Sequence, residues 1–319
     1  RQFYNQENLF DTCHDEGKKD YEYLPNKGWN GMKYTNKLRN MSKALADMGT
    51  DVLPNVGCAF IGLSEVENHK VLDALVDQAP LKARNMKYVH IEGPDRRGID
   101  CALLYNPSLF SVKNVKLLPY VQELAKDSAF FTRGFLTVRG EMAGDDVAVI
   151  VCHWPSRFSG PFYRESAARQ VKVIKDSLLN VNQEMKIFVM GDMNDDPVNK
   201  SMHVYLQAKP EISQVGAGDM YNPWYNVLAK EGKGTLFYSG NWNLFDQIVI
   251  TPNLLNKDAK KKDYSSLKYW KSHIFRRDYL IQQEGQYKGA PLRTTAGGRW
   301  LNGYSDHLPV VMYLSLIHI

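Results

Sequence analysis

Residues 186–194 read Lys-Ile-Phe-Val-Met-Gly-Asp-Met-Asn, an apolar run of strand length that ends in a glycine, a carboxylate and an amide. Short apolar runs bounded by such residues are typical of buried strands. Loops at strand ends are where a rigid scaffold presents chemically active side chains. A simple turn would also explain Gly191–Pro197, because these residue types favour turns. The interpretation therefore depends on whether other strands end in the same way.

Other apolar runs are indeed flanked by polar groups that can bind metal or move protons. These groups are Asn5, Glu65 and His153, each at the end of a run, and Asp246 at the head of one. A charge at the head of an apolar strand is costly unless it is paired. Any one of these residues could be an ordinary loop or hydrogen-bonding residue. Their recurrence at strand ends indicates a shared site.

Runs of strand length outnumber helical stretches. The predicted strands are Gln2–Tyr4, Ala59–Leu63, Lys87–Ile91, Asp100–Tyr105, Phe135–Val138, Val147–Cys152, Lys186–Met190, Phe245–Ile250 and Val310–Leu314. Apolar residues at spacings of three and four predict helices over Thr35–Met48, Lys70–Val76 and Tyr163–Val181. Because the strands do not alternate strictly with the helices, two packed sheets with flanking helices are favoured over a doubly wound sheet.

Composition excludes several classes of protein. The 319 residues are 44% hydrophobic with a net charge of +5, which is ordinary for a packed globular chain. The sequence contains no apolar run long enough to span a bilayer, no GxGxxG and no GxxxxGK[ST]. The mildly basic balance favours an anionic substrate. We expect a monomer that is exported if a leader has been removed, and cytoplasmic otherwise.

The four cysteines carry little functional signal. Cys13, Cys58, Cys101 and Cys152 form no CxxC pair, which argues against a structural zinc site. Three of them lie in or beside apolar runs. We therefore expect small buried side chains there.

The residue types at the strand ends suit phosphate ester hydrolysis. A hard divalent cation can neutralise an anionic phosphate, and Glu65 and Asp306 offer the carboxylate oxygens that such ions prefer. A histidine has the intrinsic pKa to activate water near neutral pH. A buried carboxylate such as Asp246 commonly orients such a histidine.

Five segments, in order along nearly the whole chain, resemble the endonuclease/exonuclease/phosphatase superfamily, also called the deoxyribonuclease-I-like fold. They are Tyr4–Asp11, Ser64-Glu65-Val66, Arg97–Tyr105, Gly191-Asp192-Met193-Asn194 and Ser305-Asp306-His307. The third and fourth parallel the family's strand before the active-site histidine and its GDxN motif, and the last its SDH motif. The resemblance implies one domain over residues 1–319. Its expected fold is a four-layered α/β sandwich, with two facing, mostly antiparallel sheets and outer helices.

The resemblance also implies a site that holds Mg²⁺ or Mn²⁺. Glu65 would bind the metal, with Asn5 beside it and Asp306 as a further candidate ligand. Asp192 and Asn194 would position the attacking water and the phosphate. The partner implied is an anionic phosphate ester.

Proton transfer would fall to two histidines. By resemblance, His307 is the general base, oriented by Asp246 or Asp306. His153 would contact a phosphate oxygen or protonate the leaving group, and Asp100 is a candidate to pair with His153. Apurinic-type repair endonucleases carry tyrosine where His153 stands. A histidine here is more similar to the deoxyribonuclease, sphingomyelinase and phosphatase branches.

A basic insertion, at about residues 257–300, precedes the last motif. It holds eleven basic residues against four acidic ones, interleaved with Tyr264, Tyr269, Trp270, Phe275 and Tyr279. Basic residues among aromatics can hold a nucleic-acid strand. Alternatively, the segment is a solvated surface loop packed by its own aromatics, or its charge guides another anionic substrate.

The sequence therefore predicts a divalent-metal-dependent phosphoesterase that hydrolyses phosphodiester or phosphomonoester bonds, with nucleic acid as a candidate substrate. The first alternative is a phosphatase or phosphodiesterase acting on a lipid, an inositol phosphate or another small substrate. The second is an inactive binding module on the same fold. The complete set of candidate metal and acid–base residues argues against the second alternative.

Overall fold

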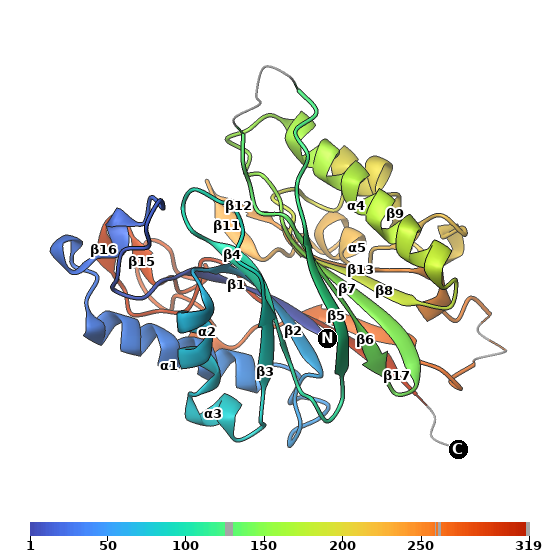
Figure 1. The fold of residues 1–319 in the computed structure, drawn as a ribbon, viewed down its shortest axis with the longest axis horizontal. Coiled ribbons are helices and arrows are strands. Elements are labelled where there is room, and N and C mark those ends of the chain that lie inside the picture. Colours follow the sequence, from blue (N-terminus) through green and yellow to red (C-terminus); the bar gives the residue numbers. More distant parts are fainter. Residues whose placement is uncertain (125–129, 259, 261–262, 317–319) are drawn as a thin grey trace.

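Two large sheets face each other, with helices on both outer sides, in the computed structural model of the chain (Figure 1). The structure describes residues 1–124, 130–258, 260 and 263–316. The first sheet contains, in spatial order, β14 (Lys268–Ile274), β17 (Val310–Ser315), β1 (Gln2–Leu9), β2 (Phe60–Val66), β4 (Asp100–Tyr105) and β3 (Lys87–His90).

The second sheet has at its centre the strand that ends in Gly191 and Asp192. In spatial order it contains β5 (Ser111–Leu118), β6 (Phe135–Met142), β7 (Asp145–His153), β8 (Lys186–Asp192), β13 (Asp246–Ile250), β10 (Met220–Tyr221) and β9 (Ala208–Lys209). Two small hairpins, β11 (Leu236–Tyr238) with β12 (Asn241–Asn243) and β15 (Thr295–Ala296) with β16 (Arg299–Trp300), stand apart from both sheets.

The helices begin at recognisable signals. They are α1 (Gly31–Asp47), α2 (His69–Val76), α3 (Ala79–Lys82), α4 (Pro161–Val181) and α5 (Trp224–Ala229). The side chains of Asn30 and Asn68 accept hydrogen bonds from the first turns of α1 and α2, and Pro161 occupies the first position of α4. The three helices predicted from apolar spacing are therefore present, with starts one to four residues earlier than predicted.

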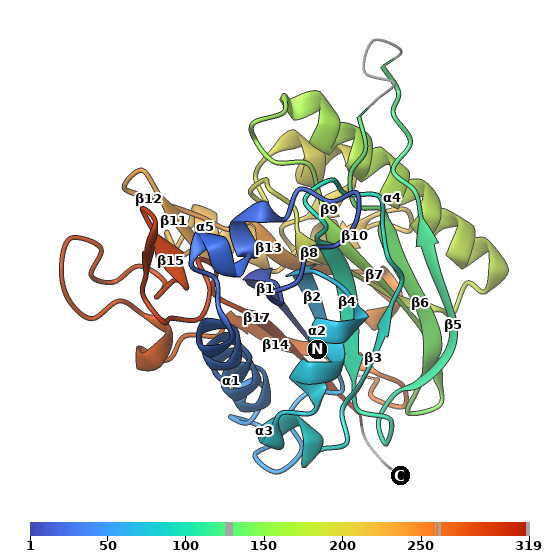
Figure 2. The ribbon, with the colours of Figure 1, turned by 60° about the vertical axis from the view of Figure 1, so that its left-hand side comes forward.

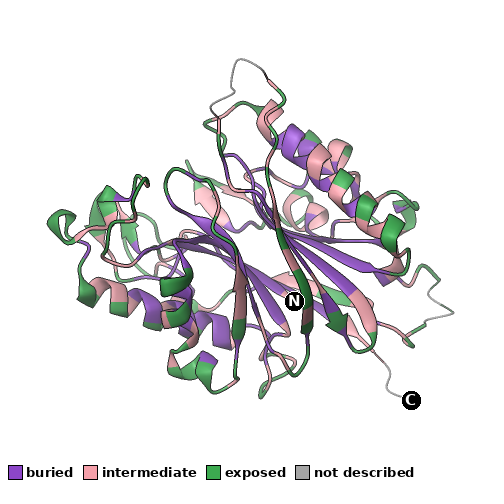
Figure 3. Cartoon of the chain, viewed as in Figure 1, coloured by how far each residue is buried: buried purple, intermediate pink, exposed green. Residues whose placement is uncertain are grey.

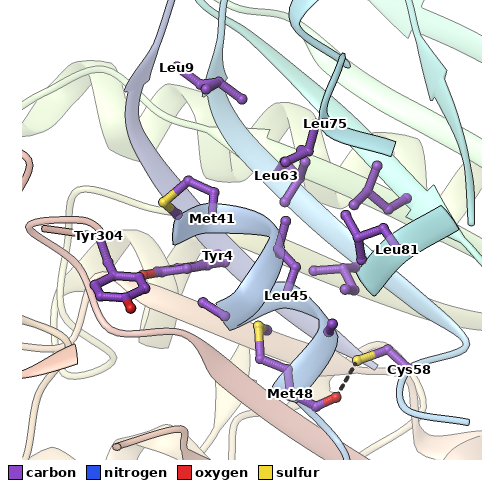
Figure 4. Close-up of a cluster of buried hydrophobic side chains, with 14 of the residues drawn as sticks. Tyr4, Leu9, Met41, Leu45, Met48, Cys58, Leu63, Leu75, Leu81 and Tyr304 are labelled. Atoms are coloured by element: carbon purple, nitrogen blue, oxygen red, sulfur yellow. Dashed lines mark hydrogen bonds between the residues drawn. The ribbon is translucent and has the colours of Figure 1, made fainter. Parts of the chain in front are cut away.

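Three hydrophobic cores separate the four layers. Met41 and Leu45 of α1 pack on Tyr4 and Leu63 of the first sheet (Figure 4). Phe3, Phe60 and Phe188 are among the residues that fill the space between the sheets, and the apolar stripe of α4 packs on the far side of the second sheet. The central strands β1, β2, β7, β8 and β13 are accordingly the most deeply buried elements, whereas β3, β5 and β14 at the sheet edges are partly exposed (Figure 3). The predicted four-layered sandwich is confirmed.

Each sheet contains one parallel pair among its central strands. In the first sheet β1 runs parallel to β2, and in the second β7 runs parallel to β8. The outer neighbours β17 and β13 run antiparallel to β1 and β8. Parallel strands present their carboxyl ends at the edge where antiparallel neighbours present their amino ends. The ends of β1, β2, β7 and β8 therefore meet the starts of β13 and β17.

Gly191 permits the close approach of β7 and β8. These strands pair Cys152 with Gly191 and His153 with Asp192. A Cβ atom at position 191 would overlap the carbonyl oxygen of Cys152. The glycine of the GDxN segment thus allows the two strand ends to lie side by side.

Two of the longer strands were not predicted, β5 and β14, and both lie at a sheet edge; the two- and three-residue strands β9–β12, β15 and β16 were not predicted either. Edge strands commonly carry lysine and other polar residues, which blunt pairing with other chains and also weaken the apolar signal. β14 pairs with β17 along its length, within the region predicted as an insertion. Two aromatics of this region serve the fold, since Phe275 is fully buried and Tyr269 packs edge-on against Tyr221, whereas Trp270 is exposed.

The first part of the basic region lies at the end of the sandwich opposite to Asp192. Lys186, at the amino end of β8, donates to Ser266 Oγ and the carbonyl of Leu267. Asp192 is the last residue of the same strand, six residues further on. At about 3.3 Å per residue, the two ends are roughly 20 Å apart. Lys261 and Lys262 of this region lie outside the described residues.

The second part of the basic region is anchored on β1 and α1. Glu7 accepts hydrogen bonds from the backbone N–H groups of Thr294 and Thr295. Lys37, fully buried on α1, donates to Thr294 Oγ1 and to the carbonyl of Tyr304. Burial lowers the pKa of Lys37 to about 8, although Glu7 acts to raise it. Hairpin β15–β16 consequently lies beside the start of α1 (Figure 2).

The three cysteines in or beside apolar runs are buried, as the sequence predicted. Cys58, Cys101 and Cys152 are buried free thiols, whereas Cys13 is exposed. Among the described residues, no helix is long and apolar enough to cross a membrane.

Replacing Lys37 with methionine tests the anchor between α1 and the second part of the basic region. The variant removes two hydrogen bonds and one of the two cations, with Arg293, that act to lower the pKa of the buried Glu7. We expect the free energy of unfolding to fall by about 1–3 kcal/mol, the usual cost of leaving a buried hydrogen-bonding group unsatisfied. Urea denaturation measures it. The exposed Arg39→Met on the same helix is the control, with an expected change within about 0.5 kcal/mol. Equal losses in the two variants would contradict the anchor.

Candidate active site

Asn5 connects the two sheets at the edge where the strand ends meet. Its amide nitrogen donates to Glu65 Oε2 on β2 at 2.7 Å and to Asp192 Oδ2 on β8 at 3.0 Å. The Asn5 oxygen accepts from the backbone N–H of Glu7. The sequence predicted Asn5 beside the metal. Its nitrogen donates to Glu65, so Asn5 orients this carboxylate, and its place beside a metal stays a prediction.

An irregularity in the pairing of β2 directs the side chain of Glu65 towards the site. The pairing of β1 with β2 shifts register after Asn5, and that of β2 with β4 shifts between Leu63 and Val66. Glu65 has a φ of 59°, and Glu7 and Asn8 also have positive φ values. Non-glycine residues in this region are strained, and such strain is commonly found at functional sites. The bulge re-aims a side chain that regular pleating would direct elsewhere.

Asp192 lies at the centre of the polar cluster. It is 2% exposed, with His153 Nε2 at 3.5 Å and His307 Nε2 at 3.7 Å from its Oδ2. Its Oδ1 accepts from the backbone N–H of Asn194. Burial raises the pKa of Asp192 to about 7, with Asp246 also raising it and His307 acting in the opposite direction. The ionised form therefore depends on neighbouring positive charge.

His307 and Asp246 form a buried pair across the seam between the sheets. His307 Nδ1 lies 2.7 Å from Asp246 Oδ2, which also accepts from the hydroxyl of Thr235. Asp306, the other residue predicted to orient His307, instead lies 3.9 Å from its Nε2. Burial alone would lower the pKa of His307, but the surrounding aspartates, Asp246 foremost, raise it well above its usual value. The site thus strongly stabilises the imidazolium form.

His153 differs from His307 in its electrostatics. Burial, reinforced by Arg133 and Arg97, lowers the pKa of His153 well below the usual value, so its imidazole is neutral. Its Nδ1 is buried and has no hydrogen-bond partner among the described residues. The amide of Asn194 next to it donates to the carbonyl of Trp154 at 2.8 Å. The other nitrogen of His153, Nε2, faces Asp192 in the site, and a neutral imidazole can contact a bound phosphate through it.

The predicted pairing of Asp100 with His153 requires correction. Asp100 Oδ2 lies 2.8 Å from His90 Nε2, and its Oδ1 accepts from the backbone N–H of Gly93. Asp100 begins β4, whose partner β3 carries His90. A strand neighbour on the same sheet therefore takes the contact that the sequence assigned to a residue on the other sheet.

Three arginines at the rim of the site were not predicted as site residues. Arg97 Nη2 lies 3.5 Å from Glu65 Oε1, and Arg293 Nη2 lies 3.6 Å from Asp306 Oδ2. Arg157 donates to the carbonyl of Asn194 at 3.2 Å. Each side chain is 42–52% exposed. Arg97 opens the Arg97–Tyr105 segment and Arg293 lies in the basic insertion, but a role at the site became visible only in the fold, because each arginine approaches from a separate loop.

The donor set fits a divalent cation. One ligand atom from each of Glu65, His153 and Asp192 lies within 4.8 Å of the others, and the same holds for Asp192, Asp246 and His307. Asp306 Oδ1 is buried without a hydrogen-bond partner among the described residues. Unpaired buried carboxylate oxygens are costly unless a proton or a cation compensates them. The mainly oxygen donors suit a hard ion such as Mg²⁺ or Mn²⁺.

Known structures share this architecture. A mannosyl-6-phosphatase of Bacteroides thetaiotaomicron is 13% identical, with a TM-score of 0.59 over 99% of this chain and 98% of that one. A humanized D. rerio TDP2 is 12% identical, with a TM-score of 0.53 over 88% and 93%. The human Nocturnin catalytic domain is 15% identical, with a TM-score of 0.50 over 99% and 95%. At these identities the likeness shows the fold alone.

The sequence itself matches a family model. No curated protein matches the chain in sequence. The model described as the endonuclease/exonuclease/phosphatase family, however, matches residues 2–316. The order of the motifs, the four-layered fold and the cluster at the strand ends agree with that match. The chain therefore belongs to the endonuclease/exonuclease/phosphatase family.

Proposed function

We propose that the protein hydrolyses phosphate esters with Mg²⁺ or Mn²⁺. The observation that carries this proposal is the proximity of a carboxylate set to a paired histidine. His307 Nδ1 is held by Asp246 at 2.7 Å, and its Nε2 lies 3.7 Å from Asp192. Such an arrangement joins a site for a hard cation to a group that can accept a proton from water.

Glu65 and Asp306 would hold the metal. A bound divalent ion supplies charge neutralisation and polarises the phosphate. Asn5 keeps the Glu65 carboxylate in place through its 2.7 Å hydrogen bond. Arg97 and Arg293, each close to one of these carboxylates, add positive charge on the open side of the site. Together these groups attract and orient a phosphate.

Asp192 and Asn194 would position the water, and His307 would accept its proton at Nε2. Asp246 fixes the tautomer by holding Nδ1 and stabilises the imidazolium that forms. Neutralisation of Asp192 and Asp306 by a cation would lower the pKa of His307 towards the range that a base needs. His153, with a neutral imidazole because burial lowers its pKa, would contact a phosphate oxygen through Nε2.

The position of the basic insertion gives little support to nucleic acid as the substrate. The first part of the insertion lies at the far end of β8; Phe275 and Tyr269 pack into the fold, whereas Trp270 is exposed. Positive charge near the site comes from Arg97 and Arg157, outside the insertion, and from Arg293 in its second part. We therefore favour the small-substrate alternative: a compact phosphate ester bound among these arginines.

Glu65→Gln tests the metal role. The substitution keeps the shape of the side chain but removes a ligand charge, so divalent-ion affinity should weaken. Hydrolysis of a chromogenic phosphate ester should fall by about 10²-fold or more, and chelator should abolish it in the wild type. Circular dichroism and metal titration by calorimetry complete the measurement. Unchanged activity and titration would contradict the role, and a wild type that cleaves no ester of any class would favour the binding module.

His307→Ala and Asp246→Asn test the proton-transfer pair. Each change should lower turnover by about 10²–10⁴-fold, the usual range for a positioned acid–base group. Because both remove one function, the double variant should be little worse than His307→Ala alone. Metal titration should remain close to that of the wild type in Asp246→Asn. A double variant whose defect equals the product of the single defects would refute the pairing.

Arg97→Met and Arg293→Met test where the substrate binds. Each should raise KM by about tenfold, as expected for losing a hydrogen bond to a charged group. Lys271→Met, on the exposed part of β14, is the matched control and should leave KM unchanged. The opposite result would be DNA or RNA binding that falls steeply with salt and is weakened in Lys260→Glu. It would favour a nuclease.

A further inference from the structure

We propose that the protein has a second cation site, suited to Ca²⁺, formed by Asp15, Asp20 and Glu67. The first two lie in the loop that follows β1, and Glu67 lies just beyond β2. The site is separate from the group around Asp192. It does not depend on the proposed hydrolytic reaction.

The three carboxylates converge although they repel one another. One oxygen from each lies within 4.8 Å of the others. Asp20 is 1% exposed and Glu67 is 2% exposed, whereas Asp15 is half-buried. Acidic groups at this spacing and depth destabilise one another unless positive charge or a proton lies among them.

Glu67 supplies an independent sign of a missing ligand. Its Oε2 accepts from the backbone N–H of Asp11 at 2.8 Å. Its Oε1 is buried and has no hydrogen-bond partner among the described residues. Buried polar atoms are nearly always partnered, so an unpaired carboxylate oxygen beside two further carboxylates indicates a bound cation.

Neighbouring groups organise the cluster without neutralising all of its charge. The backbone N–H of Asp15 donates to Asp20 Oδ2, and Asn68 donates to Asp15 Oδ2 at 2.9 Å. His14 Nδ1 contacts Asp20 Oδ1. Lys18 sends its ammonium to the carbonyls of Gly93 and Asp95 instead. The donors therefore fix the carboxylates in place, with one oxygen of each within 4.8 Å of the others.

The ligand types favour Ca²⁺. All three groups offer carboxylate oxygens, which hard ions prefer, and the one nearby imidazole nitrogen described above already contacts Asp20. Ligands from an irregular loop suit the flexible coordination of Ca²⁺ better than the strict octahedron of Mg²⁺. A transition metal would prefer nitrogen or sulfur ligands.

A cation here would stabilise a loop next to the active site. Lys18 bonds to the segment of Gly93 and Asp95, and the backbone N–H of Lys19 donates to the carbonyl of Arg96 at 2.7 Å. The following residue, Arg97, reaches Glu65. Ordering the loop of Asp15 and Asp20 would therefore also hold the arginine at the rim.

Calorimetric titration of Ca²⁺ into chelator-treated protein tests the site. The Glu65→Gln background reduces binding at the active site. In this background we expect one Ca²⁺ whose affinity falls about tenfold or more in Asp15→Asn, because a ligand charge is lost. Glu16→Gln removes the same charge from an exposed position in the same loop and should leave the affinity unchanged. Tb³⁺ luminescence gives a second measurement, since the ring of Tyr21 stacks on His14.

Three results would overturn the proposal. The first is no Ca²⁺ binding in Glu65→Gln. The second is equal affinity and stoichiometry in Glu65→Gln with and without Asp15→Asn. The third is a site that takes Zn²⁺ but not Ca²⁺ and is lost in His14→Gln. If Asp15→Asn loses the native circular dichroism spectrum, Glu67→Gln replaces it, with the same expected loss of Ca²⁺ affinity and the same control.

Discussion

The burial of several negative charges at the seam between two sheets is the constraint on which this structure depends. Asn5 donates to Glu65 on one sheet and to Asp192 on the other, and His307 contacts Asp246 across the same seam. These contacts keep like charges close together without requiring that each be neutralised within the protein. Since unpaired buried carboxylates are costly, these groups favour the binding of a cation where the sheets meet. The chemistry proposed here uses that affinity.

Strand direction explains why the charges meet at one edge. Each sheet places a parallel pair at its centre, β1 with β2 and β7 with β8, flanked by antiparallel neighbours. The carboxyl ends of the parallel strands and the amino ends of their antiparallel neighbours then lie at the same edge, so residues far apart in sequence become neighbours. Gly191 brings β7 and β8 close enough to align His153 with Asp192. A bulge with positive φ at Glu65 completes the inward orientation of the side chains.

Electrostatics around the site divides into a buried negative interior and a positive rim. The rim consists of Arg97, Arg157 and Arg293, which come from three separate loops. Part of the positive charge of residues 257–300 lies elsewhere, in the segment that Lys186 contacts at the opposite end of β8. Overall charge is thus a poor guide to substrate class, because what matters is the distance of each charge from the reacting phosphate. The loop of Asp15 and Asp20 links a second carboxylate cluster to the segment that carries Arg97.

The sequence alone determined the layered class of fold, the core strands and the order of the residues that meet at the site. Apolar runs with a polar end are local signals, and Asp100–Tyr105 was predicted with the bounds that β4 has. The sequence could not determine which side chains contact one another across strands, because register and strand order depend on pairings between distant segments. Asp100 therefore contacts His90 rather than His153, and the Asn5 amide turns its nitrogen to Glu65. The pairing of the edge strands β5 and β14, and the position of the rim arginines, likewise became visible only in the tertiary structure. Edge strands lack the strong apolar signal of buried ones, and an arginine on a loop acquires a role only when folding brings it beside a carboxylate.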